Sequence, residues 1–242
     1  TDKKIKTAIL FITSHGLYDA QINGRKVGDA YLTPGWTSYN KRLQYQQYDV
    51  TDLLKTGSNA IGVILGNGWY RGYLAWQNTH NIYGKTLGLL CQLQIEYTDG
   101  STATVVSDDS WKSSTGEIRY SEIYNGETID ARLSKGAWTK PDYDDKAWSG
   151  VKVTNYGYDN LVATQNEPVK AHETFKPVKI FTTPKGETVI DFGQNLVGWE
   201  VAKLRGNTGD TVTIDHAEGL DKQCNFYTTN LRAAKSENNY VL

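Results

Sequence analysis

An Asp-Phe-Gly triplet at residues 191–193 is the first feature of this sequence that could carry chemistry. It lies in the stretch VIDFGQNLVGWEV, residues 189–201, and in protein kinases the same triplet supplies an aspartate that holds Mg²⁺. Kinase chemistry also needs a glycine-rich loop, a strand lysine and a His-Arg-Asp loop, and the sequence contains none of them. It also lacks the G-x-x-x-x-G-K-[ST] loop that cradles phosphates. The triplet therefore does not predict a nucleotide site.

Paired carboxylates are the second candidate chemistry. Inverting hydrolysis of a glycosidic bond needs a protonated carboxyl and a carboxylate roughly 6.5 to 9.5 Å apart, with one pKa raised by burial. The candidates are Asp108, Asp109, Asp144, Asp145, Asp191, Asp215 and Glu218. Adjacent aspartates point to opposite faces of a strand and are typical of solvated turns, so the Asp-Asp pairs are not predicted to act together. His216 and Glu218 would share one strand face, and we favour a hydrogen-bonded structural pair over a polar site.

Histidine, cysteine and serine patterns do not predict a site either. His15, His80 and His172 show no metal-ligand spacing. The two cysteines, Cys91 and Cys224, have no C-x-x-C spacing and are expected to be plain buried or half-buried thiols. Ser, His and Asp occur without a nucleophile-elbow context. We therefore assign no catalytic residue and no metal ligand.

Two aromatic, glycine-rich loops have the composition of a sugar-binding surface. Proteins bind pyranosides by laying an aromatic ring against the apolar C–H face of the sugar while amides and carboxylates satisfy its hydroxyls. The loops are GWTSYNKR, residues 35–42, and GNGWYRGYLAWQNTHNIYG, residues 66–84. The candidate carbohydrate-binding residues are Trp36, Tyr39, Asn40, Trp69, Tyr70 and Trp76. The alternative is that Trp36, Trp69 and Trp111 simply close the ends of the sheets, which leaves Trp76 as the expected exposed platform.

Composition excludes several classes of partner. The 242 residues carry 26 basic and 27 acidic side chains without a basic run, so we expect no nucleic-acid partner. The longest apolar stretches are far too short to cross a bilayer and no signal peptide opens the chain, so we expect no membrane association. The compartment stays unassigned. Because the chain contains no Met, even at position 1, we expect an excised or processed fragment.

The fold class follows from alternating apolar residues and turn signals. With 16 Tyr, 7 Trp and 23 Gly, the chain has a strand-rich composition. Asn23-Gly24 and Asp99-Gly100 each separate two alternating runs, which predicts hairpins. The residues Leu89, Cys91, Leu93, Ile95 and Tyr97 are expected on one strand face. One helical turn is expected at residues 51–55, with Thr51 as its N-cap. The prediction is a mostly β protein built from antiparallel sandwiches or jelly rolls.

A polar, proline-containing stretch separates two sets of strands. We expect a first domain at residues 1–160, a linker at 161–174 and a second domain at 175–242. Second-domain strands are predicted at residues 178–182, 187–192, 197–204 and 210–216. At roughly 70 residues this domain is small for a sandwich.

A family resemblance joins these features. Residues 17–72 contain, in order, Asn-Gly, Pro-Gly-Trp-Thr, Tyr-x-x-Arg, Tyr-Asp-Val-Thr and Gly-Trp-Tyr, and this pattern resembles the N-terminal domain of bacterial α-L-rhamnosidases. SDDSWK, IYNGETIDAR, VIDFGQNLVGWEV, GDTVTIDHAEGL and FYTTNLRAAKSENNYVL resemble the concanavalin-like β-sandwich that follows in those enzymes. The likeness covers essentially the whole chain. It implies that Asp191 belongs to a strand-and-turn element of a sandwich.

The resemblance implies which parts are missing. Such enzymes carry their catalytic acids in a downstream six-hairpin helical barrel, and this sequence has no long helical region. The sandwich normally continues past Tyr240, so the second domain is expected to be truncated and to expose unpaired strand edges or an apolar face. The partners implied are rhamnose-containing glycosides and the missing catalytic domain of the same protein.

Three functions remain open at this stage. The chain is expected to be the non-catalytic N-terminal region of an inverting α-L-rhamnosidase that removes terminal α-L-rhamnose. The alternative is an autonomous carbohydrate-binding module, and a weaker third option is retained hydrolysis. The resemblance also allows for calcium, but Asn40 and Lys41 stand where an acidic ligand would be sought, so no calcium ligands are matched and no cofactor is assigned.

Overall fold

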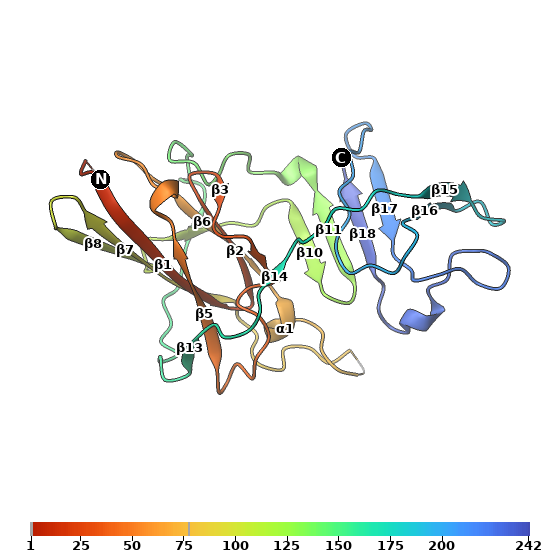
Figure 1. The fold of residues 1–242 in the computed structure, drawn as a ribbon, viewed down its shortest axis with the longest axis horizontal. Helices are drawn as coiled ribbons and strands as arrows, with labels where there is room; N and C mark the ends of the chain where they lie inside the picture. Colours follow the sequence, from red (N-terminus) through yellow and green to blue (C-terminus); the bar gives the residue numbers. More distant parts are fainter. Residues whose placement is uncertain (1, 77) are drawn as a thin grey trace. The chain divides into compact units, whose positions relative to one another are not determined.

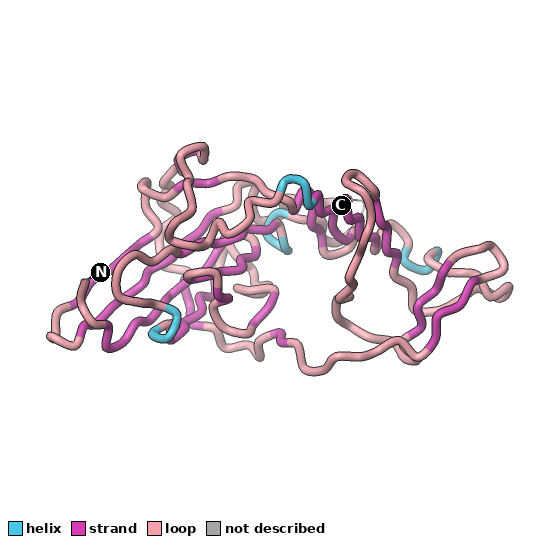
Figure 2. The backbone as a smooth tube through the Cα atoms, turned by 90° about the horizontal axis from the view of Figure 1, so that it is seen from above, coloured by secondary structure: helices cyan, strands magenta, loops and turns pink. Residues whose placement is uncertain are grey.

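Strands and the loops between them make up nearly all of the computed structural model, which describes residues 2–76 and 78–242 (Figures 1 and 2). The helical pieces of these residues are one-turn α1 (Gly68–Arg71) and the 3-10 turns η1 (Thr51–Leu53), η2 (Ala131–Leu133) and η3 (Thr229–Leu231). None of the described helices is long and apolar enough to span a bilayer. The prediction of a mostly β fold is confirmed.

The chain folds into two units that exchange a segment of sequence. The first unit contains residues 1–116 and 135–170, and the second contains residues 117–134 and 171–242. The sequence predicts contiguous domains at 1–160 and 175–242, so the transfer of residues 117–134 to the second unit is not anticipated. Those residues form a hairpin whose strand partners lie more than a hundred positions downstream.

A five-stranded sheet forms one layer of the first unit. Its order is β13-β5-β1-β7-β8, with β13 (Leu161–Ala163), β5 (Leu43–Asp49), β1 (Ile5–His15), β7 (Gly88–Tyr97) and β8 (Thr102–Val106). Central β1 pairs antiparallel with β5 and β7, and β13 joins β5 in parallel. At the β7–β8 turn, Gly100 takes a φ of +81° and the Asp99 carboxylate accepts the Ser101 amide at 2.9 Å, as the Asp-Gly signal predicts.

A three-stranded sheet forms the other layer. Its order is β3-β2-β6, with β2 (Leu17–Ile22), β3 (Arg25–Lys26) and β6 (Ile61–Gly66). The predicted Asn23-Gly24 hairpin joins β2 to β3, and both turn residues have positive φ values of 54° and 80°. The predicted helical turn is the 3-10 turn η1, but its N-cap is Val50 and not Thr51. The Thr51 hydroxyl instead accepts the Ala8 amide at 2.9 Å, which ties the turn to β1.

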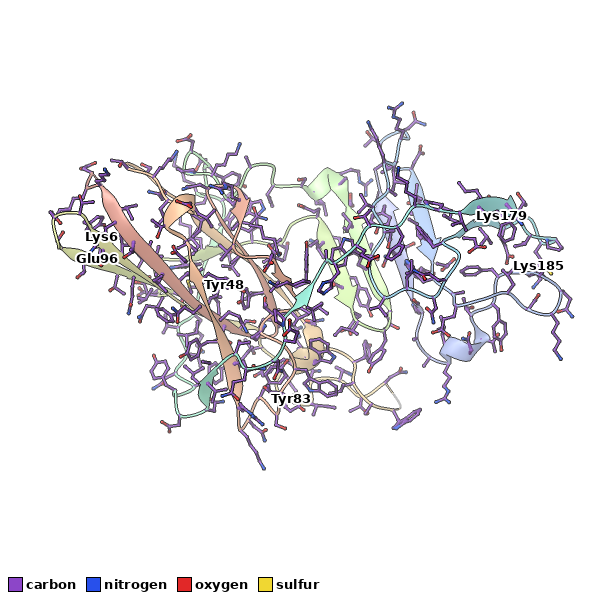
Figure 3. All side chains as sticks on the ribbon, in the orientation of Figure 1. Lys6, Tyr48, Tyr83, Glu96, Lys179 and Lys185 are labelled. Atoms are coloured by element: carbon purple, nitrogen blue, oxygen red, sulfur yellow. The ribbon has the colours of Figure 1, made fainter. Side chains whose placement is uncertain are left out.

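The core of the first unit lies between these two sheets. Alternate residues of β1, β2 and β7 form one cluster of buried side chains, which includes Leu10, Ile22 and Cys91. The predicted inward face of β7 is confirmed, because Cys91, Leu93, Ile95 and Tyr97 are buried and Leu89 packs against them. Charged residues take the solvent side: Lys6 Nζ lies 2.7 Å from a Glu96 oxygen, with a β1 and a β7 residue paired at the surface (Figure 3).

Two short strand pairs fix the segment that completes the candidate site. Leu161 of β13 pairs with Leu43, and β14 (Val169–Lys170) pairs antiparallel with β4 (Ala30–Tyr31). Residues 164–168 are therefore held at both ends, and the Thr164 amide also donates to the Tyr45 carbonyl at 3.0 Å. A further pair, β9 (Lys112–Ser113) with β12 (Ser149–Gly150), lies elsewhere in this unit.

The second unit contains a four-stranded and a two-stranded sheet. The larger has the order β10-β11-β18-β17, with β10 (Ile118–Glu122), β11 (Gly126–Asp130), β18 (Glu237–Val241) and β17 (Thr211–Asp215). The smaller pairs β15 (Lys179–Thr182) with β16 (Thr188–Asp191). After β16, the Asp191 carboxylate accepts the Gly193 amide at 2.7 Å and Gly193 takes a φ of +78°. The Asp-Phe-Gly triplet is thus a strand end and turn, as the resemblance implies.

One predicted strand of this unit is absent. Residues 197–204 were expected to form a strand, but no strand is assigned to them, so that prediction is wrong. Val197 and Val201 are almost fully exposed, which shows that no neighbouring strand covers them. Ile180 of β15 and Ile190 of β16 are exposed as well. The apolar exposure predicted for this unit is therefore observed.

Candidate functional site

Trp36 and Trp69 form an aromatic wall in the first unit. Their rings stack with centroids 6.0 Å apart and planes only 6° from parallel. Trp69 lies on α1, and Trp36 lies in the loop that leads into β5. The Trp36 indole donates to the Tyr83 hydroxyl at 3.4 Å, yet 49% of the residue stays exposed. The alternative that Trp36 only closes a sheet end does not explain so much exposed aromatic surface.

Tyr39 and Tyr70 belong to a buried cluster against which Trp69 packs. Both are buried, and they meet edge to face with centroids 5.4 Å apart. The Tyr39 hydroxyl donates to the Gly35 carbonyl at 2.8 Å, and burial raises the pKa of that hydroxyl well above its ordinary value. Tyr70 also stacks on His15, with centroids 4.6 Å apart. These two candidate residues therefore position the loops, and their ring faces are covered by protein.

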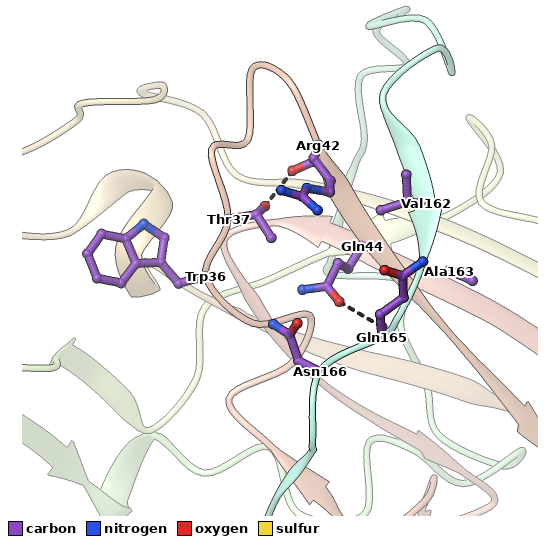
Figure 4. Close-up of a pocket in the computed structure, with 8 residues that line it drawn as sticks. All are labelled: Trp36, Thr37, Arg42, Gln44, Val162, Ala163, Gln165 and Asn166. Atoms are coloured by element: carbon purple, nitrogen blue, oxygen red, sulfur yellow. Dashed lines mark hydrogen bonds between the residues drawn. The ribbon is translucent and has the colours of Figure 1, made fainter.

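A pocket of about 180 Å³ lies next to the wall. It is lined by Trp36, Thr37, Arg42, Gln44, Val162, Ala163, Gln165 and Asn166. The side chains of Arg42, Gln44 and Asn166 converge on it, whereas the Trp36 indole extends to one side (Figure 4). The volume is below the roughly 300 Å³ of typical drug-sized ligand sites, so the pocket is small.

The floor of the pocket is a buried amide. Gln44 is only 4% exposed, and its Oε1 accepts the Gln165 amide hydrogen at 3.2 Å. In the described part of the chain, Gln44 Nε2 donates a hydrogen bond to no protein group. No fully buried side-chain nitrogen or oxygen of these residues lacks a partner, so Nε2 is not fully buried. Nε2 therefore reaches the pocket. The rim is shaped by Thr37, whose hydroxyl donates to the Arg42 carbonyl and closes the loop.

The remaining candidates lie outside this pocket. Asn40 is exposed and is not among the lining residues. Trp76 is 72% exposed, as the sequence predicts, but it belongs to a different loop. Sequence reasoning missed Arg42, Gln44, Gln165 and Asn166. Arg42 stands inside the quoted GWTSYNKR motif and could have been noted, whereas Gln165 and Asn166 lie about 120 residues away and carry no local signal.

The candidate carboxylates serve turns and local hydrogen bonds. Asp108 accepts the Ser110 amide at 3.0 Å and Asp144 accepts the Lys146 amide at 3.1 Å, as solvated turn residues do. The predicted pairing of His216 with Glu218 is wrong. His216 Nε2 instead lies 3.2 Å from Glu200, and its Nδ1 lies 2.9 Å from the Ser236 carbonyl. Glu200 lies in residues 197–204, where a strand was expected and a loop is found. The sequence therefore did not predict the contact between His216 and Glu200.

One pair of glutamates in the second unit resembles an acid–base dyad in its charges. Burial raises the pKa of Glu127, and the nearby Glu200 charge adds to this effect. Burial also opposes the charge on Glu200, but hydrogen bonds from Asn238 and Tyr240 hold its pKa below the ordinary value. The Tyr240 hydroxyl lies 2.8 Å from Glu200 and 3.4 Å from Glu127. This hydroxyl therefore links the two acids in one local hydrogen-bond cluster.

Calcium does not fit the residues of the pocket. The ion needs six to eight oxygen ligands, usually with carboxylates among them. No carboxylate lines the pocket, and Arg42 adds a positive charge to it. Residues 2–76 and 78–242 contain no group of three or more His, Cys, Asp or Glu side chains that could hold a metal.

Comparison with known proteins places these observations in a family. The sequence model of the α-L-rhamnosidase N-terminal domain family matches residues 3–173. The sequence model of the bacterial α-L-rhamnosidase concanavalin-like domain family matches residues 181–242. An α-L-rhamnosidase of Streptomyces avermitilis is 40% identical over 99% of this chain, and one of Formosa agariphila is 39% identical over 98%. The chain spans only 23% and 26% of those two relatives.

Solved structures agree with the sequence comparison. The native α-L-rhamnosidase of Aspergillus terreus superposes with a TM-score of 0.97 at 42% identity, over 100% of this chain and 28% of that one. The Streptomyces avermitilis α-L-rhamnosidase complexed with L-rhamnose gives a TM-score of 0.93 at 39% identity, over 99% of this chain and 23% of that one. The resemblance inferred from the sequence is confirmed.

Proposed function

This chain belongs to the α-L-rhamnosidase N-terminal domain family, and from that membership we propose that it is the non-catalytic N-terminal region of an α-L-rhamnosidase. The parent enzyme would remove terminal α-L-rhamnose from glycosides with inversion. The observation that carries the proposal is coverage: the whole chain aligns with rhamnosidases, yet it spans about a quarter of their length. The rest of the enzyme would supply the catalytic acids.

Two features of the described residues favour a non-catalytic, supporting role for this chain. The Tyr240 hydroxyl lies within hydrogen-bond distance of both Glu127 and Glu200, so the two glutamates belong to a structural cluster. The exposed apolar side chains of the second unit, such as Val197 and Val201, suit a surface that packs against further polypeptide of the same protein.

The first unit would assist recognition of rhamnosides through the pocket beside Trp36. The aromatic wall offers a flat apolar surface, and Gln44, Gln165 and Asn166 offer amides for the sugar hydroxyls. One similar structure is described as complexed with L-rhamnose, which makes that sugar the first ligand to test. The second candidate function, an autonomous carbohydrate-binding module, rests on the same exposed wall and pocket.

Two assays on the 242-residue chain test the proposal. With p-nitrophenyl α-L-rhamnoside we expect no release of nitrophenol, and turnover would assign catalysis to this chain. Calorimetric titration with L-rhamnose, with and without calcium, then separates scaffold from binding module. Millimolar or tighter binding that is lost in Trp36→Ala favours the module, whereas absence of binding leaves the supporting role. Trp76→Ala is the matched control, because Trp76 is exposed but lies outside the pocket.

A further inference from the structure

The pocket beside Trp36 has an electrostatic character that a neutral sugar does not require. Arg42 is its only charged lining residue, and no aspartate or glutamate lines it. Sites for neutral sugars commonly use carboxylates to accept hydrogen bonds from ring hydroxyls. Here the guanidinium provides up to five N–H donors and no acceptor.

Arg42 is not neutralised by the protein. Among residues 2–76 and 78–242, its side chain makes no ion pair and no hydrogen bond. The Thr37 hydroxyl donates to the Arg42 backbone carbonyl, so this hydrogen bond does not involve the guanidinium. That bond fixes the loop from which the side chain extends toward the pocket (Figure 4).

The Gln44 side chain also presents a hydrogen-bond donor to the pocket, independently of Arg42. Its side chain is buried, and the Gln165 backbone N–H fixes which end is which by donating to Oε1. The NH₂ end therefore points to the pocket as a fixed donor. The Arg42 guanidinium and Gln44 Nε2 are thus both donors, and a ligand with strong acceptor atoms matches these two groups.

We propose that this pocket binds an oxyanion-bearing sugar, namely a saccharide with a carboxylate or sulfate group that pairs with Arg42 and accepts a hydrogen bond from Gln44 Nε2. A uronate is the favoured ligand, because planar carboxylates match the guanidinium fork with two parallel hydrogen bonds. The proposal rests on the proposed function and narrows it to acidic rhamnose-containing saccharides.

Calorimetric or NMR titration of the full chain at low salt tests the proposal, with four probes compared. These are sodium D-glucuronate, its methyl ester, D-glucose 6-sulfate and L-rhamnose. We expect glucuronate to bind about 3- to 5-fold more tightly than its ester, because Arg42 is exposed and an ion pair at the surface is partly screened by solvent. Raising the salt should reduce this preference. Tighter binding of the sulfate than of the glucuronate would retain the proposal with sulfate as the oxyanion.

Variants assign the effect to Arg42. Arg42→Gln should remove the preference for acid over ester, and Arg42→Lys should keep part of it, because lysine retains the charge without the fork. Lys41→Gln is the matched control: it removes a neighbouring cation that does not line the pocket, and the preference should persist. The acid-to-ester comparison on the unaltered chain does not depend on whether any variant folds.

Each result has a distinct meaning. Equal binding of acid and ester, failure of both anionic sugars to bind, or an unchanged preference in Arg42→Gln would overturn the proposal. L-rhamnose binding in the same series with no anion preference would leave the proposed recognition of rhamnosides standing. Binding of anionic sugars without L-rhamnose binding would support this inference and remove the rhamnose-specific part of the proposed function.

Discussion

Gly84 allows Tyr70 to occupy its place under the aromatic wall. A Cβ at position 84 would lie 2.5 Å from Tyr70 Cζ and 2.7 Å from Cε1, distances that real Cβ atoms essentially never show. Gly84 does not have a positive φ, so the substitution Gly84→Ala imposes a steric conflict without backbone strain. Tyr70 is buried between His15 and Tyr39, so its ring has little freedom to move away.

The expected cost of Gly84→Ala is that of overpacking a core, about 1–3 kcal/mol. In a unit of this size each kcal/mol shifts the unfolding temperature by roughly 2–4 °C, so a decrease of about 2–12 °C is expected. Differential scanning calorimetry measures the shift. The control is Gly150→Ala, where an added Cβ meets no atom within 4 Å and the change should stay within about 0.5 kcal/mol.

A double-mutant cycle identifies the cause. Removing the Tyr70 hydroxyl in Tyr70→Phe relieves the worst part of the conflict, so Gly84→Ala should cost less in that background than in the unaltered chain. Because Tyr70 supports the wall formed by Trp69 and Trp36, any saccharide binding should weaken together with stability. An unchanged unfolding temperature, or strictly additive effects of the two substitutions, would refute this packing argument.

Three further predictions concern other parts of the chain. A thiol reagent should modify only Cys224 in the native protein and both cysteines in denaturant, because Cys91 is buried and burial raises its pKa to about 12; two fast-reacting native thiols would contradict this. Since burial raises the folded-state pKa of Glu127, its carboxyl stabilises the fold at low pH and that contribution is lost as the pH rises. Glu127→Gln should therefore gain unfolding temperature relative to the unaltered chain between pH 4 and pH 8, and a gap that is constant with pH would argue against it. The double variant Val197→Lys and Val201→Lys should reduce self-association in sedimentation velocity, and a strictly monomeric unaltered chain at high concentration would show that the exposed valines attract no neighbour.

Local sequence patterns predicted the elements that are stabilised locally. The Asn23-Gly24 and Asp99-Gly100 turns need positive φ, and the alternation in β7 is set by burial on one face, so both could be read from adjacent residues. The extended pattern of residues 197–204 looked the same. A strand also needs a partner, however, and sequence alternation does not show whether one is present.

Long-range pairings account for what the sequence did not reveal. The parallel pairing of β11 with β18 moves residues 117–134 into the second unit, and no local signal marks it. The aromatic residues were predicted as candidate carbohydrate-binding residues. The composition of their loops could not show that Tyr39 and Tyr70 are buried while Trp36 is exposed. Likewise, Gln165 reaches Gln44 only because β13 joins β5 in register.

An NMR titration of the isotope-labelled chain with methyl α-L-rhamnoside tests the central claim most directly, because it follows binding and bond cleavage in one sample. We predict shifts of the Trp36 indole N–H and the Gln44 side-chain amide while the glycoside stays intact. Appearance of free rhamnose would contradict the claim that this chain is non-catalytic. A spectrum in which those two resonances do not move at saturating glycoside would contradict its role in the recognition of rhamnosides.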